Sequence, residues 1–316
     1  MIFMGWFTFI ITIVTEAKNM KETLKAYIDL TRAHFLPAWP ITFCSGLVLA
    51  FANYGGFSWP LTIKAALIGL FGFEAGFVLN DYVDRNRDRL DVENTLTNYW
   101  RPFKERPIPS GKISSKNAFW LFIVLAAITS ALIFTLPYPN SLYVFAIMLY
   151  SYGIEAFYQV KKRNQKYPIA QLLGRTDFTL FPAAGYLCYG QPDMTVLLYT
   201  LFFYPWTMAH LGLNDFIDLK NDLARGMKSI TVLYGSKITI YWITGFTLLH
   251  FFAAIFFLKE LGIIAHYGFL AGFVLLAGSN LYLWKEKSPR AGLRILPLFH
   301  LTLVIYAVSI ILDFVY

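Results

Sequence analysis

Long apolar runs alternate along the chain with shorter polar segments. Each run is close to the roughly 20 residues that a helix needs to cross the hydrocarbon core of a membrane. Nine such runs occupy residues 35–54, 60–80, 117–136, 141–158, 168–190, 194–213, 231–257, 262–284 and 293–313. The pattern predicts an all-α polytopic membrane protein with nine transmembrane helices.

Composition supports a membrane protein, because 57% of the 316 residues are hydrophobic and only 15% are charged. Soluble domains have about 25% charged residues. No polar linker divides the chain, so we expect one membrane domain over residues 25–316. Residues 1–24 begin with an apolar stretch that is short for a span and lacks the basic start of a signal peptide. We expect this segment to be an interfacial helix or a dispensable leader.

Basic residues collect in alternate connections between the apolar runs. All but three of the 27 Lys and Arg residues lie in the N-terminal segment or in every second connection; the exceptions are Lys64, Lys259 and Arg175. Because Lys and Arg accumulate on the cytoplasmic side of membrane proteins, the N-terminus is predicted to be cytoplasmic and the C-terminus outside. The net charge of +8 is therefore attributed to the membrane surface and not to a nucleic-acid partner.

One acidic pattern occurs twice, as LNDYVDRNRD at residues 79–88 and LNDFIDLKND at residues 213–222. On a continuous helix, Asn80, Asp84 and Asp88 would share one face. Asp81 lies in the same arc, and the second copy repeats the arrangement with Asn214, Asp215, Asp218 and Asp222. Like charges at this spacing repel, so we expect cations to bind beside these two acidic helix faces.

Magnesium is one suitable cation, because it prefers carboxylate oxygens and is commonly bound together with substrate phosphates. A single acidic cluster is more often a solvated face, but two copies with the same spacing favour metal binding. Both copies precede long polar connections on the predicted cytoplasmic face. Nearby basic residues that could bind the remaining phosphate charge are Arg85, Lys104, Arg106, Lys161, Lys162 and Arg225. The two copies together predict a magnesium and diphosphate site at the membrane surface.

The two acidic copies resemble the Asp-rich motifs of the UbiA superfamily of intramembrane aromatic prenyltransferases. The segments ERPIPSGKIS at residues 105–114 and DLARGMKSITVLYG at residues 222–235 are similar to two further sequences of that family. The resemblance covers about residues 25–316. It implies a nine-helix bundle around a central cavity, with both Asp motifs at the cytoplasmic mouth.

The resemblance also implies roles for individual residues. Mg²⁺ and the diphosphate of an isoprenyl donor would be bound by Asn80, Asp84, Asp88, Asp218 and Asp222, with support from Asp81, Asn214 and Asp215. Arg106 would bind the diphosphate. In LYSYGIEAFYQVKKR at residues 149–163, the tyrosine that faces the allylic cation could be Tyr150, Tyr152 or Tyr158, and the base that binds diphosphate could be Lys161 or Lys162. The connection between the first Asp motif and ERPIPSG is longer than in several branches of the family.

The resemblance predicts transfer of an isoprenyl group from a diphosphate donor to a lipophilic acceptor, first of all an aromatic quinone precursor. A glycerol phosphate on the way to an ether lipid is the second acceptor, and a transporter is the alternative outside enzymes. Ionisable residues inside membrane spans are functional candidates. Here these are Glu74, Glu155, Arg175 and Asp177, which could form either a structural network or an acceptor site. The five histidines, Cys44 and Cys188 show no metal spacing and are expected to be structural.

Overall fold

A computed structural model describes residues 20–315, and these residues contain helices and no strand. A helical segment over residues 20–30 precedes the first numbered element. The elements are η1 (Ala33–Phe35), α2 (Ala38–Tyr54), α3 (Trp59–Asp88), α4 (Thr95–Trp100), α5 (Ser115–Phe134), α6 (Asn140–Lys161), α7 (Ile169–Gly174), α8 (Thr176–Leu187), α9 (Met194–Ile217), α10 (Leu219–Arg225), α11 (Ile230–Phe257), η2 (Leu258–Glu260), α12 (Ile263–Glu286) and α13 (Pro289–Val315). Of the predicted leader, residues 1–19 lie outside the described residues.

Seven helical segments of the described chain are long and apolar enough to cross a membrane: residues 33–54, which include α2, and residues 230–260, which include α11, together with α3, α5, α9, α12 and α13. This confirms the prediction of an all-α, multi-pass membrane protein. The two other predicted spans, 141–158 and 168–190, correspond to α6 and to the pair α7 and α8. That pair is interrupted at Arg175, which ends α7 and precedes α8.

Local sequence signals explain where several long helices begin. The side chains of Ser58, Ser114 and Asp193 accept hydrogen bonds from backbone N–H groups in the first turns of α3, α5 and α9. Such caps satisfy donors that otherwise have no partner at a helix start. Polar residues at the ends of the apolar runs therefore fix the helix boundaries.

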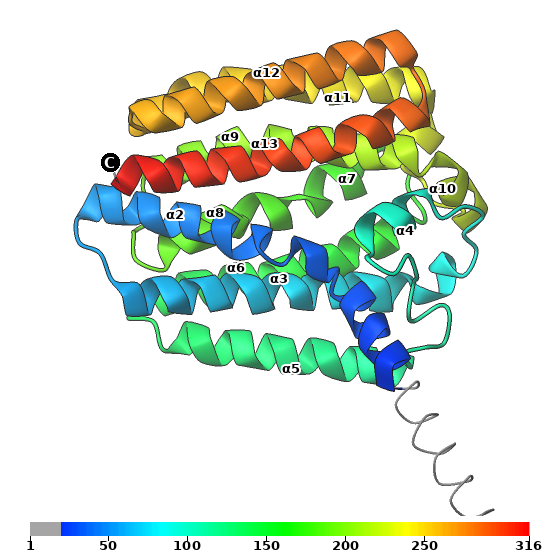
Figure 1. Ribbon diagram of the computed structural model, residues 1–316, viewed down its shortest axis with the longest axis horizontal. Coiled ribbons are helices and arrows are strands. Elements are labelled where there is room, and N and C mark those ends of the chain that lie inside the picture. Colours follow the sequence, from blue (N-terminus) through cyan, green and yellow to red (C-terminus); the bar gives the residue numbers. More distant parts are fainter. Residues whose placement is uncertain (1–19, 316) are drawn as a thin grey trace, which may run out of the picture.

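The long helices lie side by side in Figure 1, with α9 against α11, α12 against α13 and α3 against α5. The closest approach that glycine permits is between α2 and α8. A Cβ atom on Gly46 would lie 1.9 Å from the carbonyl oxygen of Pro182, and one on Gly185 would lie 1.8 Å from that of Phe43. Small residues allow such backbone contact in membrane proteins. This contact fixes α2 and α8 as two adjoining walls of the cavity described below.

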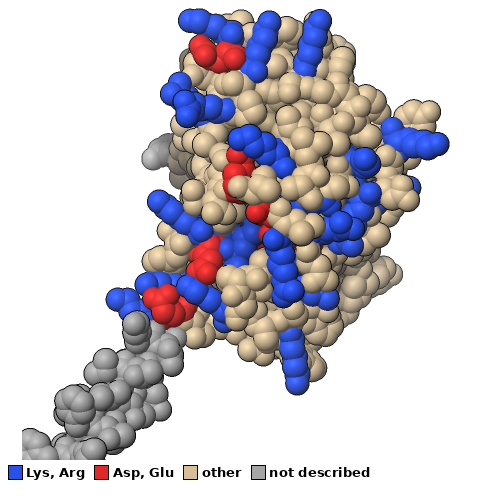
Figure 2. Space-filling model, turned by 90° about the vertical axis from the view of Figure 1, so that its right-hand side faces the viewer, with Lys and Arg blue, Asp and Glu red and all other residues tan. Residues whose placement is uncertain are grey.

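The polar connections gather at one end of the bundle, where α4 and α10 lie in Figure 1. Figure 2 faces this end and shows many Lys and Arg side chains, with Asp and Glu side chains among them. Both repeated acidic motifs belong to this end, because α3 ends at Asp88 and α10 begins at Leu219. The fold thus brings two segments that are distant in sequence to one polar face.

Candidate functional site

A cavity of about 550 Å³, here called the main cavity, is lined by residues of η1, α2, α3, α4, α5, α6, α8, α9, α10 and α13. Three polar residues of the first motif, Asn80, Asp84 and Asp88, line it together with Asn214 and Asp218 of the second. The remaining lining is mostly aromatic and aliphatic. The two acidic motifs therefore meet at one apolar chamber.

In the first motif, both aspartates that line the cavity are buried and paired with basic side chains. Asp84 lies 3.0 Å from Lys162 Nζ and 3.1 Å from Arg163 Nη2. Asp88 lies 2.6 Å from Arg106 Nη1. A buried carboxylate without a nearby cation is very costly in free energy. Lys162, Arg163 and Arg106 therefore neutralise the two buried aspartates of this motif.

The second motif is neutralised less completely. Asp218 accepts hydrogen bonds from Asn221 Nδ2 at 2.8 Å and from Arg225 Nη1 at 3.3 Å. Asp215 accepts one from the Ile230 backbone N–H at 2.9 Å. Asp222 is buried, and the Oδ2 atom of its carboxyl has no hydrogen-bond partner. Burial, followed by the nearby carboxylates of Asp215 and Asp218, raises the pKa of Asp222 to about 8.

Asp81 occupies a different environment from the other aspartates of the first motif. Arg101 Nη2 lies 2.7 Å from its Oδ2 atom, and Arg32 Nη2 lies 3.1 Å from its Oδ1 atom. Arg101 also donates to the backbone carbonyl of Asp29 at 2.6 Å. Asp81 is not among the residues that line the main cavity. It joins the N-terminal helical segment, α3 and the connection after α4.

The donor set near the two motifs fits a hard divalent cation. Within residues 20–315, no three His, Cys, Asp or Glu side chains are arranged to hold a metal ion, because basic groups lie between the carboxylates. Two buried oxygen atoms of the second motif, Asn214 Oδ1 and Asp222 Oδ2, nevertheless have no hydrogen-bond partner. Carboxylate and amide oxygens are ligands that Mg²⁺ accepts, so the residues present fit that ion.

Residues 38–313 match the model of the UbiA prenyltransferase family. The chain belongs to this family. It is 32% identical over 222 residues to a 4-hydroxybenzoate octaprenyltransferase of Marinomonas sp. strain MWYL1, which covers 67% of this chain and 70% of the relative. The predictions that the chain is a prenyltransferase, and an enzyme rather than a transporter, are confirmed.

Two solved structures share the fold. A digeranylgeranylglyceryl phosphate synthase superposes with a TM-score of 0.66 at 21% identity, over 93% of this chain and 99% of that one. A UbiA homologue from Archaeoglobus fulgidus bound to DMAPP and Mg²⁺ superposes with a TM-score of 0.63 at 16% identity, over 90% of this chain and 99% of that one. Both similarities extend over almost the whole of this UbiA prenyltransferase.

The structure separates the six basic candidates into two groups. Arg106, Lys162 and Arg225 line the main cavity, whereas Arg85, Lys104 and Lys161 do not. Arg85 lies over the ring of Tyr82 and donates to its carbonyl, and Lys104 is exposed. Of the two lysines that the sequence left open, the one paired with Asp84 is Lys162. Sequence reasoning assigned no role to Arg163, Arg101, Arg32 or Asp91. Asp91 lies 2.9 Å from Arg106 Nε and also pairs with Arg225. The many charges between residues 85 and 106 were the only sign of Asp91 and Arg101.

The three candidate tyrosines of α6 point in different directions. Tyr152 lines the main cavity and donates to the carbonyl of Gly72 at 3.1 Å. Tyr150 lies outside the lining, is partly exposed and shares a hydrogen bond with Thr176. Tyr158 is buried in the wall, with Lys162 Nζ 4.7 Å and Arg175 Cζ 5.3 Å from its ring centroid. Its ring therefore contacts both a cation of the motif region and one inside the predicted spans.

A histidine network borders the same cavity. His210 Nε2 lies 2.9 Å from His300 Nε2, and His300 Nδ1 lies 2.6 Å from the hydroxyl oxygen of Tyr99. The ring of His210 stacks on Trp206 with centroids 5.2 Å apart. His210 and His300 both line the cavity. The sequence pattern gave no sign that His300, which lies in the last apolar run, would reach the site.

Proposed function

We propose that this prenyltransferase moves an isoprenyl group from an isoprenyl diphosphate to a lipophilic acceptor, with an aromatic quinone precursor as the first choice. One observation carries the proposal: acidic residues of both motifs line the same cavity as the basic residues Arg106, Lys162 and Arg225, and that cavity continues between aromatic side chains. Charged groups can hold the diphosphate while the apolar walls hold the prenyl chain.

Magnesium would be held by Asp84, Asp88, Asp218 and Asp222, with Asn80 and Asn214 beside them. When bound, the ion would supply positive charge to the departing diphosphate. Asp81 and Asp215 are engaged by Arg101 and by the Ile230 backbone N–H, which supports a positioning role for both. Catalysis would then depend on carboxylates that exchange a basic partner for the metal.

Arg106, Lys162 and Arg225 would bind the diphosphate oxygens. In the structure each of these residues contacts an aspartate of the motifs, so metal binding to the aspartates would leave their donors facing the phosphate. Charge-assisted hydrogen bonds to phosphate are among the strongest in proteins. They would stabilise negative charge as the allylic C1–O bond breaks.

Aromatic faces near the reacting carbon would stabilise the allylic cation. Tyr152 and Trp39 line the main cavity, and Trp39 stacks on Phe73 with centroids 3.9 Å apart. A desolvated aromatic face contributes about 0.5–2 kcal/mol to cation binding. The same walls would exclude water, which would otherwise capture the cation.

The relatives support two classes of acceptor. The Marinomonas relative is named for 4-hydroxybenzoate, which supports an aromatic acceptor. The fold shared with a digeranylgeranylglyceryl phosphate synthase keeps a glycerol phosphate acceptor as the second candidate. Both acceptors carry an anionic group.

For the membrane arrangement we propose nine crossing segments, in which α6 and the pair α7 and α8 join the seven apolar helices. The N-terminus would be cytoplasmic, the C-terminus outside and the active site at the cytoplasmic face. The concentration of Lys and Arg at the end of the bundle that holds both motifs supports this orientation (Figure 2). Residues 1–24 would form the leader, of which 20–24 are helical.

The test is a transfer assay in nanodiscs with geranylgeranyl diphosphate and Mg²⁺. The acceptors are 4-hydroxybenzoate and geranylgeranylglyceryl phosphate. Asp84→Ala and Asp218→Ala should lose transfer by at least about 100-fold, whereas Glu286→Ala, at an exposed acid on α12, should retain it. Absence of product with both acceptors in the wild type would refute the proposal. So would full activity of both motif variants.

A further inference from the structure

Arg175 is a cation inside the predicted membrane span 168–190, at the junction of α7 and α8. Its side chain lines the main cavity. A charged side chain at this depth is costly unless a partner compensates it. The neighbouring groups are therefore decisive for its role.

Arg175 forms no salt bridge in the part of the chain that the structure describes, and its Nε atom is buried without a hydrogen-bond acceptor. Three acids, Asp177, Glu155 and Asp215, are near enough to interact with its charge, but each accepts hydrogen bonds from other groups, in the case of Asp215 from the Ile230 N–H. Glu155 Oε1 accepts from Asn80 at 2.6 Å and Gln159 at 2.5 Å, and Asp177 Oδ1 accepts from the Phe178 N–H at 2.5 Å.

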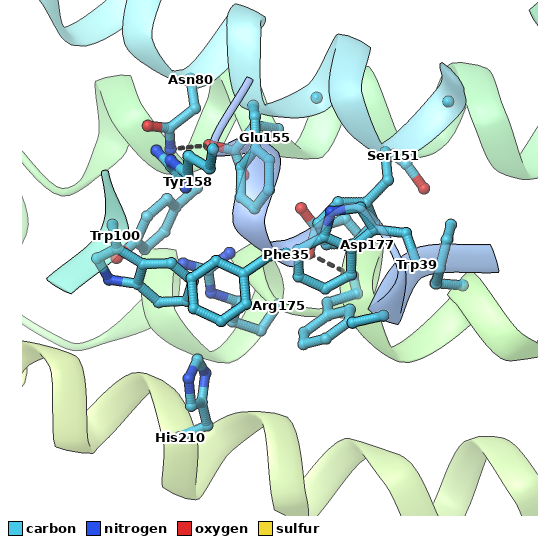
Figure 3. Close-up of a pocket in the computed structure, with 18 of the residues that line it drawn as sticks. Phe35, Trp39, Asn80, Trp100, Ser151, Glu155, Tyr158, Arg175, Asp177 and His210 are labelled. Carbon is cyan, nitrogen blue, oxygen red and sulfur yellow. Dashed lines mark hydrogen bonds between the residues drawn. The ribbon is translucent and has the colours of Figure 1, made fainter. Parts of the chain in front are cut away.

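The ring of Tyr158 contacts two cations, Arg175 and Lys162. Lys162 is the lysine that pairs with Asp84 of the first motif. Figure 3 shows that Arg175 lines the cavity together with Tyr158, Glu155 and Trp100. A guanidinium group with a free donor thus borders an aromatic chamber, next to the predicted diphosphate site.

We propose that Arg175 binds the anionic group of the acceptor. This inference rests on the prenyl transfer proposed above and narrows its acceptor to a lipophilic or aromatic molecule that carries a carboxylate or a phosphate. The planar guanidinium can donate two parallel hydrogen bonds to either anion, and the apolar surroundings strengthen them. The flat rings of Trp39, Phe73 and Trp100 in the same lining suit an aromatic body.

The donor diphosphate is the rival source of the same anion chemistry. Arg175 also borders a small pocket that contains Asp218, Asp222 and Lys162, so its guanidinium could reach toward the phosphate side. The two sources differ in a measurable way, because only the acceptor can be changed from an anion to a neutral molecule without altering the donor.

The experiment compares 4-hydroxybenzoate with its methyl ester, which keeps the ring and hydroxyl and lacks the negative charge. The second matched pair is geranylgeranylglyceryl phosphate and its phosphate-free glycerol ether. In Arg175→Gln, the KM for the anionic acceptor should rise about 10- to 100-fold, as expected for loss of a charged hydrogen bond. The KM for the neutral analogue and for geranylgeranyl diphosphate should stay within about twofold.

Two further variants guard against a general defect. Arg175→Lys keeps the charge without the planar fork and should recover part of the acceptor affinity. Arg290→Gln removes an exposed arginine at the start of α13 and should leave every KM unchanged. Mg²⁺-dependent donor binding and the melting temperature of Arg175→Gln, both compared with the wild type, report whether its site is folded.

The outcomes separate the inference from the function on which it rests. An equal rise in the KM for the donor with charged and neutral acceptors would assign Arg175 to the diphosphate and overturn the inference. Unchanged KM values for the anionic acceptors in Arg175→Gln would also overturn the inference. If the wild type still transfers the prenyl group, the proposed function is unaffected by that result. A wild-type protein that transfers to no acceptor would refute both.

Discussion

Asp81 offers the sharpest test of what separates a structural aspartate from a metal ligand in one motif. It is 2% exposed and lies between Arg101 and Arg32. Removing one partner of a buried ion pair leaves an uncompensated charge and costs about 3–5 kcal/mol. We therefore predict that Asp81→Asn lowers the apparent melting temperature by on the order of 10 °C.

The assay is thermal unfolding in detergent, monitored by tryptophan fluorescence, combined with Mg²⁺ titration of donor binding well below the melting temperature. Asp81→Asn should bind donor with a Mg²⁺ midpoint within about twofold of the wild type, because Asp81 does not line the cavity. Asp84→Asn should lose the Mg²⁺ response. A double variant, Asp81→Asn with Arg101→Met, should be less destabilised than the sum of the single variants by about 1–3 kcal/mol.

Two results would refute this reasoning. If Asp81→Asn melts within about 2 °C of the wild type, the ion pairs contribute little to the folded state. If it melts normally and loses the Mg²⁺ response, Asp81 is a metal ligand and its arginine contacts are replaced when the ion binds. The first result concerns stability and the second concerns the site, so each has a clear meaning.

Three further predictions use neighbouring positions as controls. Lys162→Met should lower kcat by about 100-fold through loss of a charge on the diphosphate, whereas Lys161→Met should stay near the wild-type rate; equal effects would contradict the assignment. Tyr152→Leu should slow transfer about 2- to 30-fold, and Tyr150→Leu should not, as rate measurements under saturating donor would reveal. Burial raises the pKa of Asp222 to about 8, so its carboxyl must lose a proton to bind Mg²⁺ at pH 7. Calorimetry should show this proton release at pH 7, and the Mg²⁺ affinity should rise with pH until about 8. A pH-independent affinity would exclude Asp222 as a ligand.

The broad architecture could be predicted because it depends on local chemistry. Apolar length determines where a helix can cross a membrane, and the boundaries at Ser58, Ser114 and Asp193 follow from capping side chains close by in sequence. The spacing of the acidic residues in each motif likewise fixes which of them share one face of a helix. The break at Arg175 was not predicted, because the run 168–190 is mostly apolar and its two charged residues, Arg175 and Asp177, do not by themselves end a helix.

From the amino-acid sequence alone one obtains a multi-pass helical protein with two acidic motifs and an excess of positive charge between alternate apolar runs. Which side chains reach the cavity depends on how the helices pack. Asp81 and Asp84, like Lys161 and Lys162, differ by a rotation about the helix axis. Sequence spacing gives that angle within one helix, but which direction faces the other helices depends on how they pack. The close approach at Gly46 and the partners Arg101 and Arg163 come from distant segments, so packing alone assigned each aspartate its surroundings.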